Sequence, residues 1–191
     1  MGFFTADLCD VFSNKTEVLG PDFQSYGGNR KFKGEVITVK LDKNNKDLAT
    51  LLKDSDGVGK VVIVDVNMRY FAVVGDNLMK FASDSKYEGI IVNGYVRDTV
   101  TTKEFDIGLI AKGTCPRKYI PVQDGLINVP ITIDDVEINP GDFVYVDPDG
   151  IVISKEKLIY YVSIWFWFFN KFSICSKIFQ KSFKSRWFNS C

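Results

Sequence analysis

Residues 60–98 read KVVIVDVNMRYFAVVGDNLMKFASDSKYEGIIVNGYVRD, and this stretch decides the fold. Its apolar runs over 61–64 and 90–92 are continuous, as in strands that are covered on both faces. Between the two runs, the segment 76–86 follows Gly75 and places apolar residues at helical spacing: Leu78, Met79, Phe81 and Ala82. A strand, a helix and a strand in succession predict a βαβ unit, which is a parallel strand pair joined by a right-handed crossover.

The segments around this unit extend the pattern in both directions. A short helix is predicted over 5–12 with Thr5 as its N-cap, a strand over 34–40 and a helix over 45–53. After Arg97 the helical spacing disappears, and Gly, Pro and Asp separate short strands over 107–111, 127–133, 143–146 and 151–153. We therefore expect one compact α/β domain with a β-rich second half.

Composition excludes several classes of function. The chain has 191 residues, 46% of them hydrophobic, which suffices for a core without metal or disulfide support. Its 24 basic and 24 acidic residues cancel, which argues against direct nucleic-acid binding. The absence of histidine excludes Ser-His-Asp triads, histidine bases and histidine-based zinc sites. A cytoplasmic protein with reduced thiols is expected, since there is no secretory signal and the cysteines are far apart: Cys9, Cys115, Cys175 and Cys191.

The last part of the chain differs from the rest in composition. Residues 158–191 contain all three tryptophans and five basic residues but no acidic one, whereas residues 1–157 carry a net charge of −5. We interpret 1–157 as the domain and 158–191 as an extension. Its apolar run over 158–169 is shorter than the roughly 20 residues that span a bilayer, so a membrane anchor is the least favoured reading. Two interpretations of residues 158–191 stay open: they are a non-native extension, or they pack at an oligomer or membrane interface.

Two short segments of the decisive stretch can carry chemistry. The first, Gly75-Asp76-Asn77-Leu78, opens the predicted helix, and the unpaired N–H groups of a helix start can bind an anion. The alternative is that Asp76 and Asn77 are only helix caps.

The second segment, Arg97-Asp98, follows the second strand, where ligands bind in parallel α/β sheets. The guanidinium of Arg97 can hold a carboxylate with two hydrogen bonds, and Asp98 offers an oxygen ligand for Mg²⁺ or Mn²⁺. The alternative is an ordinary surface ion pair. Because both segments lie at the same sheet edge, we expect them to form one site.

Asp76, twenty intervening residues and then Arg97-Asp98 resemble the D-x20-R-D signature of the 4-hydroxy-4-methyl-2-oxoglutarate aldolases, in the family of the regulator of ribonuclease activity A. The resemblance continues in family order over about residues 5–157. It implies a three-layer β/β/α sandwich, similar to swivelling phosphohistidine domains, and a homotrimer or a hexamer built from trimers.

The resemblance also implies a role for each site residue. Asp98 would bind the divalent cation directly, and Asp76 would act through a water on that cation. Arg97 would hold the carboxylate and keto oxygen of a pyruvate unit, whose carboxylate the backbone N–H groups from Gly75 to Leu78 would receive. The expected activity is cleavage of 4-hydroxy-2-oxo acids to pyruvate, with oxaloacetate decarboxylation as a side reaction.

The sequence departs from the family pattern at two places. The Gly-rich, Ser-containing loop common in the family is replaced here by residues 66–71, VNMRYF, and the glutamate that aldolases borrow from a neighbouring subunit has no counterpart in the extension. Some family members bind ribonuclease E instead of catalysing a reaction, and these carry the acid three residues after the arginine. Here Val100 occupies that position, which favours the lyase over the ribonuclease regulator. A methyltransferase, an older label in the family, is disfavoured because no G-x-G-x-G loop follows the first strand.

Overall fold

The structure is a computed structural model that describes residues 3–42, 44–118 and 124–158. At its centre are four parallel neighbouring strands: β3 (Phe32–Lys40), β4 (Lys60–Asp65), β6 (Gly89–Val96) and β7 (Gly108–Thr114). The predicted βαβ unit is confirmed, since Val62 of β4 pairs with Ile90 of β6 in parallel and helix α3 (Asp76–Asp84) lies between the two strands in the chain. The sequence pattern missed β5 (Ala72–Val74), which pairs with the end of β6.

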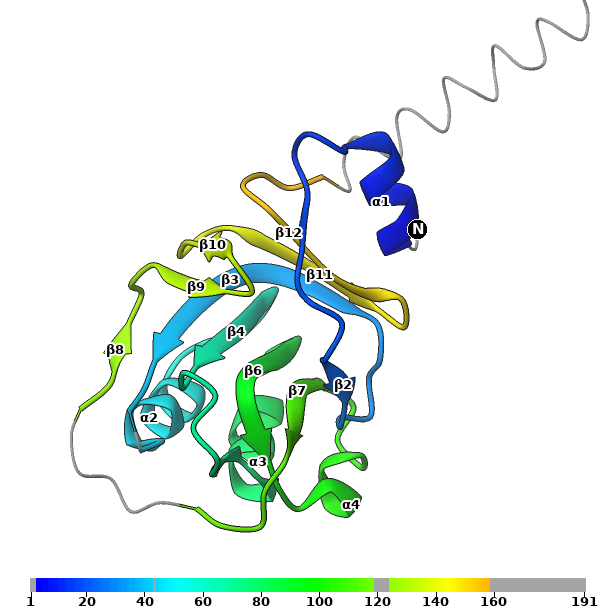
Figure 1. Ribbon diagram of the computed structural model, residues 1–191. Coiled ribbons are helices and arrows are strands. Elements are labelled where there is room, and N and C mark those ends of the chain that lie inside the picture. The colour runs from blue at the N-terminus through cyan, green and yellow to red at the C-terminus, as the bar shows by residue number, and fades with distance from the viewer. Residues whose placement is uncertain (1–2, 43, 119–123, 159–191) are drawn as a thin grey trace, which may run out of the picture.

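Antiparallel strands extend both edges of this centre, and the whole sheet curls (Figure 1). On the β3 side the order continues through β11 (Phe143–Asp147) and β12 (Gly150–Ser154) to β1 (Glu17–Val18); on the other side β2 (Gln24–Ser25) pairs with β7. The short strands predicted over 143–146 and 151–153 are confirmed as β11 and β12, which pair with each other as a hairpin.

The single strand predicted over 127–133 is wrong. The chain instead forms β8 (Leu126–Ile127), which pairs with β3, and β9 (Ile131–Ile133), which pairs with β10 (Val136–Ile138). The break has a local cause, because Asn128 adopts a left-handed backbone at φ 57° and Pro130 has no N–H to donate to a ladder.

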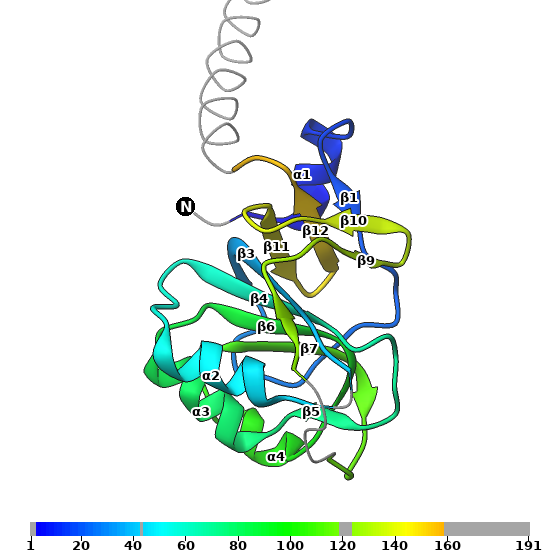
Figure 2. The same cartoon turned by 90° about the vertical axis from the view of Figure 1, so that its left-hand side faces the viewer.

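Helices cover one face of the central sheet and a second β layer covers the other (Figure 2). The helical layer consists of α2 (Lys46–Asp54), α3 and the short α4 (Thr99–Thr102). Alternate residues of β4 separate the two cores: Val62 and Val64 pack with the helices, whereas Val61 and Ile63 pack with the second β layer. The expected three-layer β/β/α arrangement is therefore confirmed.

Helix α1 (Thr5–Val11) lies outside these layers and is tied to the β11–β12 hairpin. The prediction that Thr5 caps this helix is wrong, because Phe4 occupies the N-cap position. The Thr5 amide and hydroxyl instead donate hydrogen bonds of 2.8 and 2.6 Å to the carboxylate of Asp147, which is distant in sequence. The N-terminal segment is thus fixed by a long-range contact.

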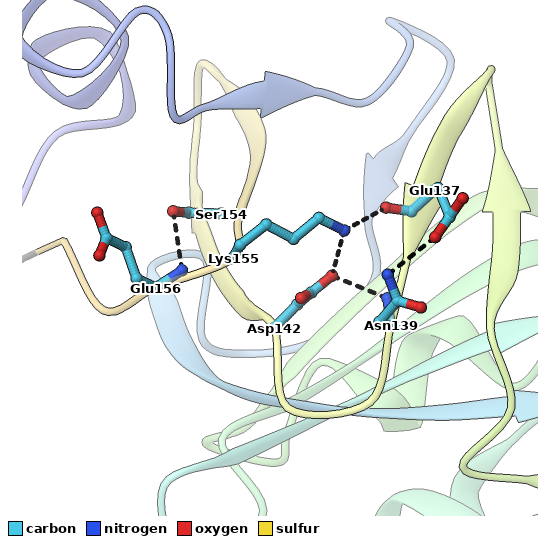
Figure 3. Close-up of polar contacts among 6 residues, drawn as sticks. All are labelled: Glu137, Asn139, Asp142, Ser154, Lys155 and Glu156. Atoms are coloured by element: carbon cyan, nitrogen blue, oxygen red, sulfur yellow. Dashed lines mark hydrogen bonds and ion pairs between the residues drawn. The ribbon is translucent and has the colours of Figure 1, made fainter.

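The turn before β11 is fixed by a buried carboxylate (Figure 3). Asp142 accepts hydrogen bonds from the Asn139 amide at 2.8 Å and from Lys155 Nζ at 2.9 Å, and Lys155 also donates to the Glu137 carbonyl at 2.9 Å. These bonds join the chain after β10 to the end of β12.

The packed part of the chain extends one residue past the expected domain boundary. Leu158 is fully buried among Phe3, Leu8, Tyr145 and Val152, and its N–H donates to the Tyr145 hydroxyl at 2.7 Å. The rest of the 158–191 extension lies outside the described residues. Within the described ranges, no helix has the length and apolar character needed to cross a membrane.

Candidate active site

The first turn of α3 presents unpaired backbone N–H groups. Gly75 is the N-cap, and no side chain caps the helix. Among the described residues, Asp76 accepts hydrogen bonds only from Asn77, whose backbone nitrogen lies 2.7 Å from Asp76 Oδ1. Within the described part of the chain, the N–H groups of Asp76 and Leu78 have no acceptor. The helix start therefore keeps donors for an anion, although the N–H of Asn77 is already bound to the Asp76 carboxylate.

Arg97 and Asp98 stand at the carboxyl end of β6, next to this helix start. The Arg97 amide donates to the Val74 carbonyl at 3.0 Å, which attaches the end of β6 to β5 directly before Gly75. Arg97 Nε lies 3.2 Å from Asp98 Oδ2, and the two side chains are 29% and 36% exposed. Asp98 has a left-handed backbone, φ 55° and ψ 35°, which ends the strand and starts α4.

Gly75 joins the two segments by close approach. A Cβ atom at this position would lie 2.5 Å from Asp98 Oδ2 and 3.2 Å from Arg97 Nε. Because the backbone of Gly75 is extended, φ −141° and ψ −166°, any residue could adopt it, and only space requires glycine here. The two segments chosen from the sequence are thus in contact.

A cavity of about 340 Å³ opens at this junction. Five of the six predicted site residues line it: Gly75, Asp76, Asn77, Leu78 and Arg97. Asp98 does not belong to the lining and reaches the site through its contacts with Arg97 and Gly75. The cavity is small and carries both charge signs, which suits a small carboxylic acid rather than a large apolar ligand.

Two further polar residues line the cavity and were missed by the sequence analysis. Asn45 precedes α2, and its side-chain amide donates to the Val73 carbonyl at 2.9 Å. Lys118 follows β7 and adds a second cation to the lining. No motif or spacing in the sequence connects either residue with Arg97, since only the tertiary fold brings them to one cavity.

The carboxylates fit a loosely held divalent cation. No group of three or more acidic or thiol side chains that could enclose a metal occurs in the described part of the chain. Asp98 nevertheless engages only Oδ2 with Arg97, and its Oδ1 accepts no hydrogen bond from a described residue. Mg²⁺ commonly binds through one or two carboxylates and keeps several waters, so this donor set is compatible with it.

Comparison with known proteins places most of the described domain in one family. The family model described as RraA-like, Aldolase/RraA, matches residues 5–153. A protein of Shewanella oneidensis is 41% identical over 153 residues, covering 80% of this chain and 93% of its own. One of Bacillus cereus is 39% identical over 159 residues, covering 81% and 97%. Both are named "Putative 4-hydroxy-4-methyl-2-oxoglutarate aldolase".

Solved structures agree with this assignment. A protein from Geobacillus kaustophilus, described as an S-adenosylmethionine:2-dimethylmenaquinone methyltransferase, superposes with a TM-score of 0.79 at 35% identity, covering 83% of this chain and 98% of that one. The RNA-processing inhibitor RraA from Thermus thermophilis gives a TM-score of 0.78 at 34% identity, covering 82% and 94%. Sequence and fold therefore point to the same family.

Proposed function

The chain belongs to the RraA-like family, and from this premise we propose that it is a divalent-metal-dependent lyase that cleaves 4-hydroxy-2-oxo acids to pyruvate. The proposed type of substrate is 4-hydroxy-4-methyl-2-oxoglutarate, and oxaloacetate decarboxylation is the proposed side activity. One observation carries the proposal: the start of α3 and the Arg97-Asp98 pair meet at Gly75 beside a single small cavity.

Substrate binding follows from the donors around the cavity. The N–H groups of Asp76 and Leu78 offer hydrogen bonds to a carboxylate, with the positive end of the helix dipole behind them. The guanidinium of Arg97 can bind the same carboxylate and the adjacent keto oxygen. Lys118 can receive a second carboxylate, as carried by oxaloacetate and by 4-hydroxy-4-methyl-2-oxoglutarate.

Bond cleavage needs stabilisation of an enolate and a base. Breaking the bond between C3 and C4 leaves negative charge on the enolate oxygen of pyruvate, where the fixed positive charge of Arg97 stabilises it. Asp76 lines the cavity and can accept the proton of the C4 hydroxyl, directly or through a water. A divalent cation held by Asp98 would add Lewis acidity at the 2-oxo group. Loss of carbon dioxide from oxaloacetate gives the same enolate, which explains the proposed side activity.

The second candidate is a protein that binds and regulates a ribonuclease of the E type, as the similarity to RraA suggests. The position of the acid separates the two candidates. In this chain it is Asp98, adjacent to Arg97, whereas the position three residues after the arginine is Val100, which is 82% exposed and has no ligand atom. The lyase is therefore the better supported reading.

The test is release of pyruvate from oxaloacetate and from 4-hydroxy-4-methyl-2-oxoglutarate, with Mg²⁺ or Mn²⁺ against EDTA. We expect turnover with metal, none with EDTA, and none for Asp98→Ala, while the surface control Asp106→Ala keeps full activity. Turnover by Asp98→Ala in EDTA would remove the metal from the proposal. A folded protein that releases no pyruvate from either acid would contradict the lyase and leave the regulator.

A further inference from the structure

A second cavity lies at the opposite end of the central strands from the candidate active site. It measures about 160 Å³, and Gly59 and Glu88, which directly precede β4 and β6, form part of its wall. The other polar side chains in the wall are Lys33, Glu35, Tyr145 and Lys157. The candidate active site is at the carboxyl ends of these strands, so the two cavities are separate.

Two lysines in this wall lack the ionic partners that their neighbours have. Lys155 is paired with Asp142 (Figure 3), and Glu156 is paired with Lys15. Among the described residues, no carboxylate oxygen lies within 4.0 Å of the Lys33 or Lys157 ammonium group. The Lys33 Nζ lies 5.7 Å from the centroid of the Phe3 ring.

The surroundings of Lys33 lower the pKa of its ammonium group. Burial lowers the pKa of Lys33 below its usual value, the charge of Lys157 lowers it further, and the carboxylate of Glu88 raises it in opposition. Lys157 faces Lys33 from the chain after β12, and Glu88 faces it from the residue before β6. Glu35 lies on the same strand as Lys33, and Tyr145 lies on β11, which pairs with that strand. At a pH below the lowered pKa, each unit by which the pKa falls raises the fraction of a lysine that is neutral amine about tenfold.

We propose that Lys33 is a site of Nζ acylation by a small acyl phosphate. The cavity is below the roughly 300 Å³ of pockets for drug-sized ligands, so only a small donor fits. Lys157 in the wall and Lys31 outside it, whose Nζ lies 5.1 Å from the same Phe3 ring, place positive charge near Lys33 that attracts an anionic donor against the wall carboxylates of Glu35 and Glu88.

The reaction balances without an oxidant or a cofactor. The lone pair of Lys33 Nζ attacks the carbonyl carbon of the acyl phosphate, and the bond from this carbon to the phosphate oxygen breaks. Inorganic phosphate leaves with the bonding electrons, an amide forms, and the ammonium proton goes to water. The charge of Lys33 is lost, and with it the repulsion between Lys33 and Lys157.

The test is a time course of full-length protein with acetyl phosphate at pH 7.5, in which mass spectrometry of peptides gives the acetylation rate of each lysine. Lys53 is the internal reference, because it is exposed on α2 and forms no ion pair with a described residue. We expect Lys33 to react several-fold faster than Lys53. We also expect Lys157→Gln to slow Lys33 several-fold and Glu88→Gln to accelerate it, with Lys53 unchanged in both variants.

The two variants are expected to change the acetylation rate of Lys33 in opposite directions. A general change in stability would also change the acetylation rate of Lys53, so the two explanations can be separated. Equal rates at Lys33 and Lys53 in the unmodified protein would overturn the proposal. So would a Lys33 rate that Lys157→Gln leaves unchanged. Preference for Lys33 with acetic anhydride but not with acetyl phosphate would contradict the assigned donor, since anhydride carries no charge for Lys157 to attract.

Discussion

Asp98 shows how the backbone of one residue can change the direction of the chain at the end of a strand. Successive side chains of a strand point to opposite faces of the sheet, which would separate Arg97 from Asp98. The left-handed backbone of Asp98 turns the chain at this point, and both side chains come to lie against Gly75. Aspartate tolerates this conformation better than most residues, yet it carries a cost of the kind that is often retained at functional sites.

Arg97→Lys keeps the positive charge but loses the planar fork and the Nε contact with Asp98. Because hydrogen bonds to charged groups contribute about 1.5–3 kcal/mol, we expect kcat/KM for oxaloacetate to fall by roughly tenfold to a hundredfold. KM should rise and kcat should fall, since the same contact stabilises the enolate. The control is Arg69→Lys, which changes a surface ion pair with Asp42. If Arg97→Lys equals the unmodified protein in steady-state kinetics, Arg97 serves only as a structural ion-pair residue.

Gly75→Ala places a methyl group into the contact between α3 and the Arg97-Asp98 pair. The half-exposed carboxylate of Asp98 can move away, so we expect stability to fall by only about 1–3 kcal/mol. Activity should fall by about a hundredfold, because displacement of a positioning group by an ångström has that order of effect. Gly113→Ala is the control, since its Cβ would touch only the ring of Tyr95 at 3.2 Å. Kinetics with oxaloacetate and thermal unfolding distinguish the two effects, and unchanged kcat/KM would contradict the assigned contact.

At the residue scale, sequence reasoning succeeded where chemistry follows local order and failed where it depends on distant contacts. The segments 75–78 and 97–98 could be paired because both follow from one βαβ unit, whose strand ends share an edge. Asn45 and Lys118 could not be found, because loops outside that unit bring them to the cavity. Thr5 was assigned to a cap that its local sequence favours, although the buried carboxylate of Asp147 competes for its hydroxyl.

Elements with a strong period were predicted within two residues, as for β4 at 60–65 and α3 at Asp76–Asp84. Short strands were not, since a strand such as β5 has too few residues for a period and exists only through its pairing with β6. The interruption between β8 and β9 depends on two residues, the left-handed Asn128 and Pro130, which has no N–H. Sheet order and the attachment of α1 rest on contacts across the whole chain.

The attachment of α1 predicts a pH dependence of stability. Burial by itself would raise the pKa of Asp147, but hydrogen bonds from the Thr5 hydroxyl and amide and from the Asp149 amide, together with the charge of Lys31, hold this pKa below its usual value. A folded-state pKa below the unfolded one stabilises the fold at higher pH. The contribution is complete above about pH 5 and declines as the pH falls past the unfolded value near 3.9.

Thr5→Val removes the hydroxyl donor and keeps the side-chain volume. We expect it to lower the free energy of unfolding at pH 7 by about 1.5–3 kcal/mol, the range for a hydrogen bond to a charged group. The difference from the unmodified protein should shrink toward pH 3, because a falling pH favours the protonated carboxyl of Asp147, whose hydrogen bond with Thr5 is weaker than that of the carboxylate. Urea unfolding at both pH values measures it, with Thr132→Val on the exposed side of β9 as the control. If Thr5→Val lowers the free energy of unfolding equally at both pH values, the loss comes from packing and not from the hydrogen bond to Asp147.

At the scale of the whole molecule, the described domain has its own cores, and its last buried residue is Leu158. We therefore expect a chain shortened to residues 1–158 to fold, to form the trimer that family resemblance implies and to keep its lyase activity. A chain ending at residue 157 loses the Leu158 side chain and its hydrogen bond to Tyr145, so it should be less stable by about 2–4 kcal/mol.

Gel filtration, thermal unfolding and the oxaloacetate assay on both shortened chains test this prediction, with the full chain as reference. Equal stability of the two shortened chains would show that Leu158 contributes nothing to the packed domain. A monomeric or insoluble product from residues 1–158 would mean that 159–191 takes part in the assembly. In that case the tryptophans and basic residues of the extension would be interface residues, because an aromatic segment of this density is costly to expose to water.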